Sequence, residues 1–148
     1  MSQLGNIESE YIQKVSLEHR KKFAQFFTPQ LIAELMADWL LRSDNLKTIL
    51  EPAFGLGVFS RVLLAKKQDL SIRGFEIDNV IAGEASKHFG QCESVQLMLQ
   101  DYMYNDWENQ YDGIICNPPY FKFHDYANKS VIAEMERKLS CKLNGFTN

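Results

Sequence analysis

Four consecutive residues late in the sequence, Asn117-Pro118-Pro119-Tyr120, could hold and activate a planar amine. The nitrogen of an exocyclic amine is a poor nucleophile because its lone pair is delocalised into the ring. Two acceptors for its two N–H bonds would draw it toward tetrahedral geometry, and the Asn117 side-chain oxygen and the Pro118 carbonyl could be those acceptors. Successive prolines fix φ and supply no N–H, so their carbonyls stay directed outward, while Tyr120 offers a ring on which a flipped base could stack. The tetrapeptide therefore fits methyl transfer to an exocyclic amine, with a purely structural Pro-Pro turn as the alternative.

A second group of candidates is the stretch Glu51-Pro52-Ala53-Phe54-Gly55-Leu56-Gly57, which stands between an apolar run and a helical pattern. Glycines at such a turn let the backbone pass close to a ligand, and the helix that follows offers free N–H groups. Glu76 follows Gly57 by 19 residues, where a carboxylate can accept the hydroxyl protons of a ribose. Asp101 ends the next apolar run. Acidic residues at three successive strand ends predict a nucleoside-binding edge, although each alone could be a helix cap or a loop carboxylate.

The glycine loop departs from the pattern of nicotinamide dinucleotide binding, which needs a third glycine three residues after the second. Ser60 occupies that position. A loop that begins with an acid and lacks this glycine suits a cofactor with an ammonium group and no pyrophosphate. S-adenosylmethionine is such a cofactor, since Glu51 could meet its ammonium group directly or through water, and backbone N–H groups could bind its carboxylate. We therefore expect S-adenosylmethionine, with a nicotinamide cofactor as the competing possibility.

Alternating apolar patterns indicate the elements that would position these residues. Helices are expected over 8–23, 29–41, 58–67, 79–89 and 128–143. Strands are expected over 47–51, 71–77, 94–100 and 111–117. Thr28 would be the N-cap, and Pro29 the first residue, of the second helix. Strands that alternate with helices predict parallel βαβ units and a doubly wound sheet, with an exposed fourth strand unless something covers it.

Length, composition and net charge limit the classes of protein to which the chain could belong. The 148 residues would form one domain with N-terminal helices over 1–45, a βαβ cofactor and catalytic core over 46–121, and a helical tail over 122–148. No apolar run reaches the roughly 20 residues that span a bilayer. The three cysteines form no C-x-x-C pair and the three histidines lack ligand spacing, so we expect no metal and reduced thiols in a cytoplasmic protein. The net charge of -3 indicates that most affinity for DNA would come from residues outside this chain.

Taken together, the motifs over about residues 23–121 resemble the amino-methyltransferases of restriction–modification systems, the N6-adenine group with the cofactor motif before the catalytic motif. The resemblance implies a Rossmann-like S-adenosylmethionine-dependent methyltransferase fold (α/β), here incomplete, with the first four parallel strands in the order 3-2-1-4 and flanking helices. It also implies methylation of a flipped adenine in double-stranded DNA. The family's three further strands, loop aromatic and target-recognition domain are absent from this sequence. A missing C-terminal region or a second copy in a homodimer would then cover the fourth strand.

The resemblance also implies a role for each matching residue. Asn117, Pro118, Pro119 and Tyr120 would be the catalytic tetrapeptide, with Asn117 also beside the cofactor. Phe27, Thr28 and Pro29 resemble the N-terminal motif that touches the methionine end of the cofactor. The other cofactor contacts would come from Glu51, Pro52, Ala53, Phe54, Gly55, Gly57, Glu76, Ile77, Asp101 and Tyr102. Among these, Glu76 would bind the ribose and Asp101 the adenine moiety, while Phe54 and Ile77 would flank the cofactor.

Two other functions stay open. Glutamine methyltransferases of release factors and some amine methyltransferases of ribosomal RNA use the same Asn-Pro-Pro-aromatic turn, although the Phe-Thr-Pro segment favours the DNA group. A catalytically silent binding module that needs a partner is the alternative from another class.

Overall fold

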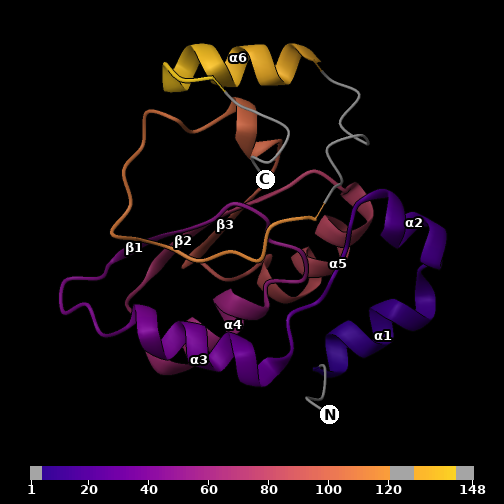
Figure 1. Ribbon diagram of the computed structural model, residues 1–148. Helices are drawn as coiled ribbons and strands as arrows, with labels where there is room; N and C mark the ends of the chain where they lie inside the picture. Colours follow the sequence, from indigo (N-terminus) through magenta and orange to yellow (C-terminus); the bar gives the residue numbers. More distant parts are fainter. Residues whose placement is uncertain (1–4, 121–128, 143–148) are drawn as a thin grey trace. The chain divides into compact units, whose positions relative to one another are not determined.

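The computed structural model describes residues 5–120 and 129–142, and the chain forms two units, residues 1–118 and 119–148. The first unit contains a parallel sheet with helices α1 to α5, shown in indigo to orange in Figure 1. The second unit contains helix α6, Lys129–Leu139, which lies within the helix expected over 128–143.

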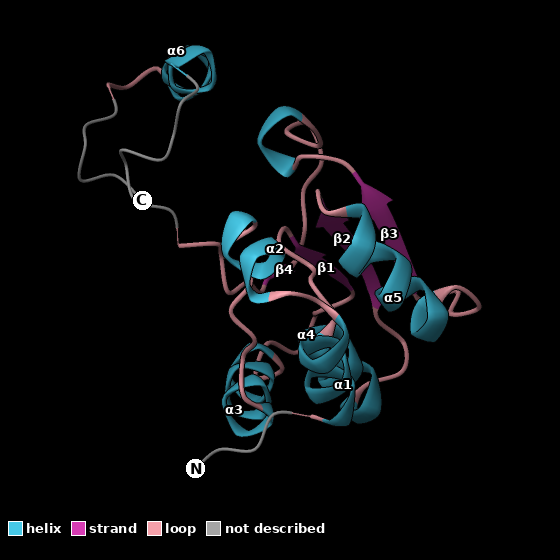
Figure 2. Cartoon of the chain, turned by 90° about the vertical axis from the view of Figure 1, so that its right-hand side faces the viewer, coloured by secondary structure: helices cyan, strands magenta, loops and turns pink. Residues whose placement is uncertain are grey.

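Four parallel strands make up the sheet: β1 (Thr48–Glu51), β2 (Ser71–Glu76), β3 (Val95–Leu99) and β4 (Gly113–Ile114). Their order is β3-β2-β1-β4, which confirms the predicted 3-2-1-4 arrangement, and Figure 2 shows the arrows of β2 and β3 pointing the same way. Because all strands are parallel, their carboxyl ends meet at one edge of the sheet. The residues that follow each strand are therefore brought together there.

The fourth strand is shorter than the expected 111–117. Strand β4 pairs with β1 through Gly113 and Ile114, and one further hydrogen bond runs from the Ile115 N–H to the Leu50 carbonyl. Three residues later Pro118 has no N–H to donate, so the ladder ends. Within the described residues β4 has β1 as its partner and leaves its other edge open, with Ile114 60% exposed.

One face of the sheet is buried under helices α3 (Gln30–Leu40), α4 (Val58–Lys66) and α5 (Asn79–Phe89). Ile49, Ile72 and Val95 are neighbours in the strand register and belong to one core cluster with residues of these helices. Helices α3 and α4 lie side by side (Figure 1). The bounds of α4 and α5 agree with the ranges 58–67 and 79–89 that the apolar spacing predicted.

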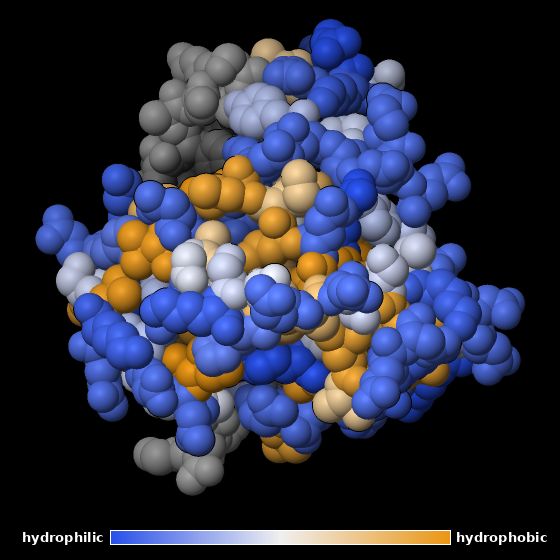
Figure 3. Space-filling model, turned by 180° about the vertical axis from the view of Figure 1, so that it is seen from behind, coloured by the Kyte–Doolittle hydropathy of each residue, from blue (hydrophilic) through white to orange (hydrophobic). Residues whose placement is uncertain are grey.

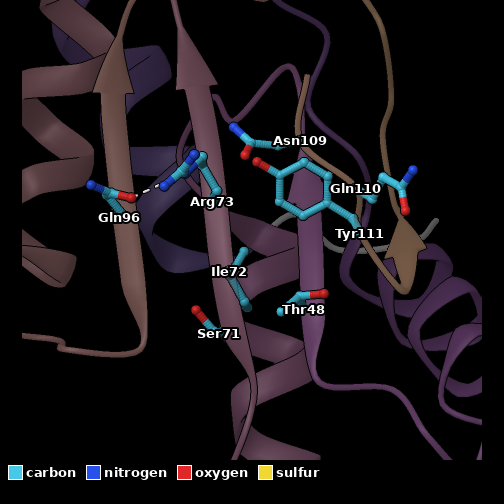
Figure 4. A pocket seen from close by; sticks show the side chains of 8 residues that line it. All are labelled: Thr48, Ser71, Ile72, Arg73, Gln96, Asn109, Gln110 and Tyr111. Atoms are coloured by element: carbon cyan, nitrogen blue, oxygen red, sulfur yellow. Dashed lines mark hydrogen bonds between the residues drawn. The ribbon is translucent and has the colours of Figure 1, made fainter. Parts of the chain in front are cut away.

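The opposite face of the sheet carries Arg73 and Gln96, and the segment 100–112, with the short 3₁₀ helix η1 (Tyr102–Tyr104), lies against it. Arg73 Nη1 lies 3.0 Å from Asp106 Oδ1, and Tyr111 donates to the other oxygen of the same carboxylate. A cavity of about 170 Å³ lies between Arg73, Tyr111 and the beginnings of β1 and β2 (Figure 4). It lies at the amino ends of the strands and therefore on the other edge of the sheet from the predicted site.

The N-terminal region differs from the single helix expected over 8–23. It forms α1 (Asn6–Lys14) and α2 (Leu17–Lys22), because Val15 is extended and Ser16 caps α2 by accepting the His19 N–H. Helix α3 begins at Gln30 with Pro29 as its N-cap residue, one residue later than predicted. Thr28 therefore does not cap α3, which leaves its hydroxyl available for a contact elsewhere.

Apolar side chains also reach the surface, and Figure 3 shows them among polar ones on the face seen from behind. On α3 an exposed apolar row follows helical spacing, with Leu31, Leu35 and Trp39 each at least 66% exposed. None of the described helices is long and apolar enough to cross a membrane. Among the described residues there is also no cluster of histidine, cysteine and acidic side chains that could hold a metal ion.

Candidate cofactor and catalytic site

The carboxyl edge of the sheet collects the three predicted acidic residues. Glu51 is the last residue of β1, Glu76 is the last residue of β2, and Asp101 follows β3 by two positions. The glycine loop runs beside the end of β2, because the Phe54 N–H donates to the Phe75 carbonyl over 2.8 Å. The sequence thus predicted correctly which acidic residues lie at this edge.

Glu76 joins the glycine loop to the turn after β2. One carboxylate oxygen accepts the Gly55 N–H at 2.9 Å, and the other accepts the N–H groups of Ile77 and Asp78 at 2.8 and 2.9 Å. Burial raises the pKa of Glu76, while these three backbone donors act to lower it. Since a carboxylate has about four acceptor positions, Glu76 keeps capacity for a hydroxyl donor while it holds the loop in place.

Glu51 is fully buried, which the sequence did not predict. Its Oε2 accepts the Ser60 hydroxyl at 2.6 Å, and its Oε1 has no hydrogen-bond partner among the described residues. Burial raises the pKa of Glu51 to about 8, with smaller opposing effects from the Ser60 hydrogen bonds and Arg61. An unpaired buried carboxyl oxygen is costly, so this atom is a place where a polar ligand group would be stabilising.

The glycines of the loop have the conformations that their sequence position suggested. Gly55 and Gly57 have φ values of 54° and 71°, in the left-handed region that favours glycine. Gly57 is the N-cap residue of α4, and a Cβ atom there would stand 2.5 Å from the Phe89 ring. Gly57 thus lets the loop lie close to the core, while Gly55 supplies the left-handed backbone conformation of its turn.

The Phe54 ring is placed differently from the expectation that it would flank the cofactor. The side chain is 2% exposed, packs against Phe89 with ring centroids 5.2 Å apart, and lies over Gly74. The ring supports the loop from the core side, so any cofactor contact of Phe54 would come from its backbone. Ile77, by contrast, is 50% exposed beside Glu76, as a flanking residue requires.

Asp101 and Tyr102 hold the turn after β3. Asp101 is the N-cap residue of η1 and accepts the Met103 N–H at 2.9 Å. The Tyr102 ring lies 5.4 Å from that of Phe75, which packs it against the sheet. Their predicted contacts with the cofactor stay predictions.

Asn117 lies at the end of β4 and is in contact with the N-terminal motif. Its Nδ2 donates to Thr28 Oγ1 at 3.0 Å and to the Phe26 carbonyl at 3.3 Å. The preceding residue, Cys116, has its pKa raised to about 11 by burial and by the nearby charge of Glu51. Asn117, the Phe-Thr-Pro motif and Glu51 are therefore neighbours, although they are far apart in the sequence.

The other predicted site residues divide between the two units. The Phe27 ring lies 5.6 Å from the Tyr11 ring and Pro29 is the N-cap residue of α3, while Pro52, Ala53 and Pro118 lie at the carboxyl edge. Pro119 and Tyr120 begin the second unit, where Tyr120 is 65% exposed. The stacking role of Tyr120 stays a prediction.

Several residues that build the site were missed by the sequence reasoning. Asp78 is 1% exposed and accepts hydrogen bonds from His19 Nε2 at 2.7 Å and Gln25 Nε2 at 2.6 Å. The Tyr11 hydroxyl donates to Gln25 Oε1 at 3.2 Å. These contacts fasten the N-terminal helices to the turn that carries Glu76. Asp78 could have been found as an N-cap before the helix at 79–89, whereas nothing in the sequence marks Gln25.

Comparison with known proteins assigns this arrangement to a family. Residues 2–143 match the family described as N-6 DNA Methylase. The chain belongs to this family. It is 61% identical over 144 residues to the Type II methyltransferase M.AccI of Acinetobacter calcoaceticus, covering 97% of this chain and 27% of that protein. It is also 33% identical over 81 residues to a tRNA1(Val) (adenine(37)-N6)-methyltransferase of Shewanella halifaxensis, covering 51% of this chain and 32% of that protein.

A solved structure supports the fold of this family member. The methyltransferase subunit of a type I restriction-modification system from Streptococcus thermophilus aligns with a TM-score of 0.55 and 21% identity, over 74% of this chain and 29% of that one. The sheet is therefore of the Rossmann-like S-adenosylmethionine-dependent methyltransferase type. The chain spans about a third or less of the length of the two relatives named above.

Proposed function

We propose that this chain is the cofactor-binding and catalytic part of an enzyme that transfers a methyl group from S-adenosylmethionine to the exocyclic amine of a flipped adenine in DNA. The enzyme would belong to a restriction–modification system and act in the cytoplasm. The observation that carries this proposal is the position of Asn117 at the same sheet edge as Glu51 and Glu76, in a chain 61% identical to a Type II methyltransferase.

The residues at this edge fit S-adenosylmethionine. Glu76 has acceptor capacity for a ribose hydroxyl, and Asp101 lies beyond the neighbouring strand for the adenine moiety. The unpaired Oε1 of Glu51 would receive the ammonium group, and Gly55 and Gly57 let the backbone come close. The bound cofactor would supply an electrophilic methyl group on a sulfonium.

The chain's own residues would act on the amine rather than on the methyl group. Asn117 Oδ1 and the Pro118 carbonyl would accept the two N–H bonds of the amine and localise the nitrogen lone pair. Tyr120 would stack on the flipped base, a contact worth about 1–3 kcal/mol. Positioning and hydrogen bonding lower the barrier, so no proton needs to leave before attack.

Cofactor binding can be tested on this chain. In a calorimetric titration with S-adenosylmethionine we expect saturable binding that Glu76→Ala weakens at least about a hundredfold, since hydrogen bonds to a charged group contribute about 1.5–3 kcal/mol each. Glu108→Ala, which removes an exposed carboxylate from segment 100–112, is the matched control. Thermal unfolding must be followed as well, because Glu76 also accepts three backbone N–H groups. Equal affinity of wild type and a folded Glu76→Ala variant would contradict the assignment.

Double-stranded DNA is the proposed substrate, bound mainly through regions outside this chain. Two surfaces could be covered by further polypeptide or by a second copy of the chain. They are the open edge of β4 and the exposed apolar row on α3, formed by Leu31, Leu35 and Trp39. The substrate can be tested with a chimera in which this chain replaces the matching segment of M.AccI. We expect methyl transfer to adenine in duplex DNA that Asn117→Ala abolishes without weakening cofactor binding.

An RNA amine is the second candidate substrate, and the similarity to a tRNA adenine-N6 methyltransferase favours keeping it. The same chimera would be assayed with duplex DNA, transfer RNA and release factor as methyl acceptors. Transfer to RNA or protein without transfer to DNA would overturn the DNA assignment. A silent binding module would bind cofactor and methylate none of the three.

A further inference from the structure

The side-chain amide of Asn117 is held by acceptors on one side. Its Nδ2 carries two hydrogens, and two acceptors stand within reach of that nitrogen: Thr28 Oγ1 at 3.0 Å and the Phe26 carbonyl at 3.3 Å. Both acceptors come from residues 24–29, which we call the bridging segment. Neither acceptor is in β4 or the glycine loop, so the contact exists only because the fold brings this segment to the end of the sheet.

The bridging segment is fixed at several points. Gln25 donates to the buried Asp78 carboxylate at 2.6 Å, next to the turn that carries Glu76. The Phe27 ring packs on Tyr11, and Thr28 is 7% exposed. The segment thus runs from the end of β2 to the end of β4 and presents its acceptors to Asn117 from a fixed position.

An asparagine amide has two different faces, and only one of them can activate an amine. Oδ1 accepts hydrogen bonds, whereas Nδ2 only donates them. A substrate amine offers N–H donors, so an outward Nδ2 would place donors against donors. The Thr28 and Phe26 acceptors favour the orientation in which Nδ2 turns inward and Oδ1 is left for the substrate.

We propose that Thr28 is a positioning residue that, with the Phe26 carbonyl, orients the Asn117 amide so that Oδ1 receives the substrate amine. This inference rests on the proposed function and adds to it, because it gives the Phe-Thr-Pro motif a role in activating the amine. Thr28 would act through Asn117 and need not touch the cofactor.

The orientation is tested first on this chain by NMR. The Asn117 side-chain amide signals are assigned by their loss in Asn117→Asp. Thr28→Val, which keeps the shape and removes the acceptor, should shift these signals and speed their hydrogen exchange by about fivefold, the factor expected for one neutral hydrogen bond. Thr28→Ser should restore both. Thr48→Val removes a hydroxyl that bonds Asp112 at the opposite edge of the sheet, and should leave the Asn117 signals unchanged.

The consequence for the reaction is tested in the M.AccI chimera. We expect Thr28→Val to lower kcat by about fivefold to a hundredfold, a range set by one lost hydrogen bond and by misplacement of an acceptor. KM for DNA and Kd for S-adenosylmethionine should change less than twofold, and Thr28→Ser should recover most of kcat. This pattern separates orientation of Asn117 from a contact with the cofactor.

Each outcome has one meaning. Unchanged Asn117 amide signals in Thr28→Val, or a raised cofactor Kd with unchanged kcat, would overturn the positioning role. A wild-type chimera that binds cofactor and methylates none of the acceptors would instead contradict the proposed function. The NMR comparison would still decide whether Thr28 orients the amide.

Discussion

The buried carboxyl of Glu51 should make the proposed binding of S-adenosylmethionine dependent on pH. In the free chain its pKa is raised to about 8, chiefly by burial, so the group is protonated at neutral pH. An ammonium group placed at Oε1 would favour the carboxylate form, because an opposite charge stabilises it. Binding of S-adenosylmethionine should therefore release a proton from Glu51.

The size of the change in cofactor affinity with pH follows from the pKa of Glu51. If only the carboxylate form binds, the apparent Kd is multiplied by 1 + 10^(pKa − pH), so the affinity should increase about tenfold from pH 6 to pH 7. Ser60, Arg61 and Glu76 also affect the pKa of Glu51, each less than burial does. Cys116 lies nearby as well, and there it is the charge of Glu51 that raises the pKa of the thiol. The free α-amino group of the cofactor titrates at about pH 8, so the measurement belongs below pH 7.5.

Calorimetry at pH 6.5 in buffers of different ionisation enthalpy measures the released protons directly. We expect about one proton released per cofactor bound, since a group with a pKa near 8 is almost fully protonated there. Glu51→Gln is the matched control, since it keeps an oxygen to accept the Ser60 hydroxyl and cannot titrate. It should bind more weakly, release no proton and show no pH slope. A wild-type affinity that is constant from pH 6 to pH 7.5, with no proton release, would refute the reasoning.

Three further predictions concern stability, each followed by thermal or denaturant unfolding of the cofactor-free chain. Because the folded pKa of Glu51, about 8, lies above its ordinary value of 4.5, its contribution to the free energy of unfolding is fully present below pH 4.5 and is lost as pH rises through 8. At pH 9 Glu51→Gln should be more stable than wild type by on the order of 4 kcal/mol. Equal stability of the two proteins at pH 9 would contradict the buried carboxyl. Gly74→Ala would put a Cβ 2.1 Å from Phe54 Cδ2 and should cost about 1–3 kcal/mol, a prediction that an unchanged midpoint would rule out. Gln25→Ala should cost about 1–3 kcal/mol by leaving the buried Asp78 underpaired, whereas Gln30→Ala, which loses a part-buried bond to Glu34 within α3, should cost under about 1 kcal/mol. Similar losses for both would argue against the bridging role of Gln25.

The sequence by itself determined the arrangement of the elements. Apolar periodicity placed α4, α5 and the first three strands within one or two residues, the alternation of strands with helices predicted a parallel sheet, and the family resemblance of the motifs supplied the order β3-β2-β1-β4. These features depend on residues close together in the chain. The same local patterns placed Glu51, Glu76 and Asp101 at successive strand ends, so the edge that carries the site followed from the sequence.

Only the tertiary structure decided which side chains meet at that edge. Ser60 was read as a departure from a dinucleotide pattern and is the partner of the buried Glu51. Phe54 was expected beside the cofactor and lies in the core over Gly74. Thr28 was expected to cap α3, yet it accepts a hydrogen bond from Asn117, 89 positions later in the chain.

The physical reason is the same in these cases. A hydrogen bond or a ring contact depends on the direction in which a side chain points after the helices have packed on the sheet, and composition and spacing do not contain that direction. The buried carboxyl of Glu51 and the oriented amide of Asn117 are therefore properties of the folded edge. The residue types are written in the sequence, whereas their protonation and orientation are set by neighbours that the fold supplies.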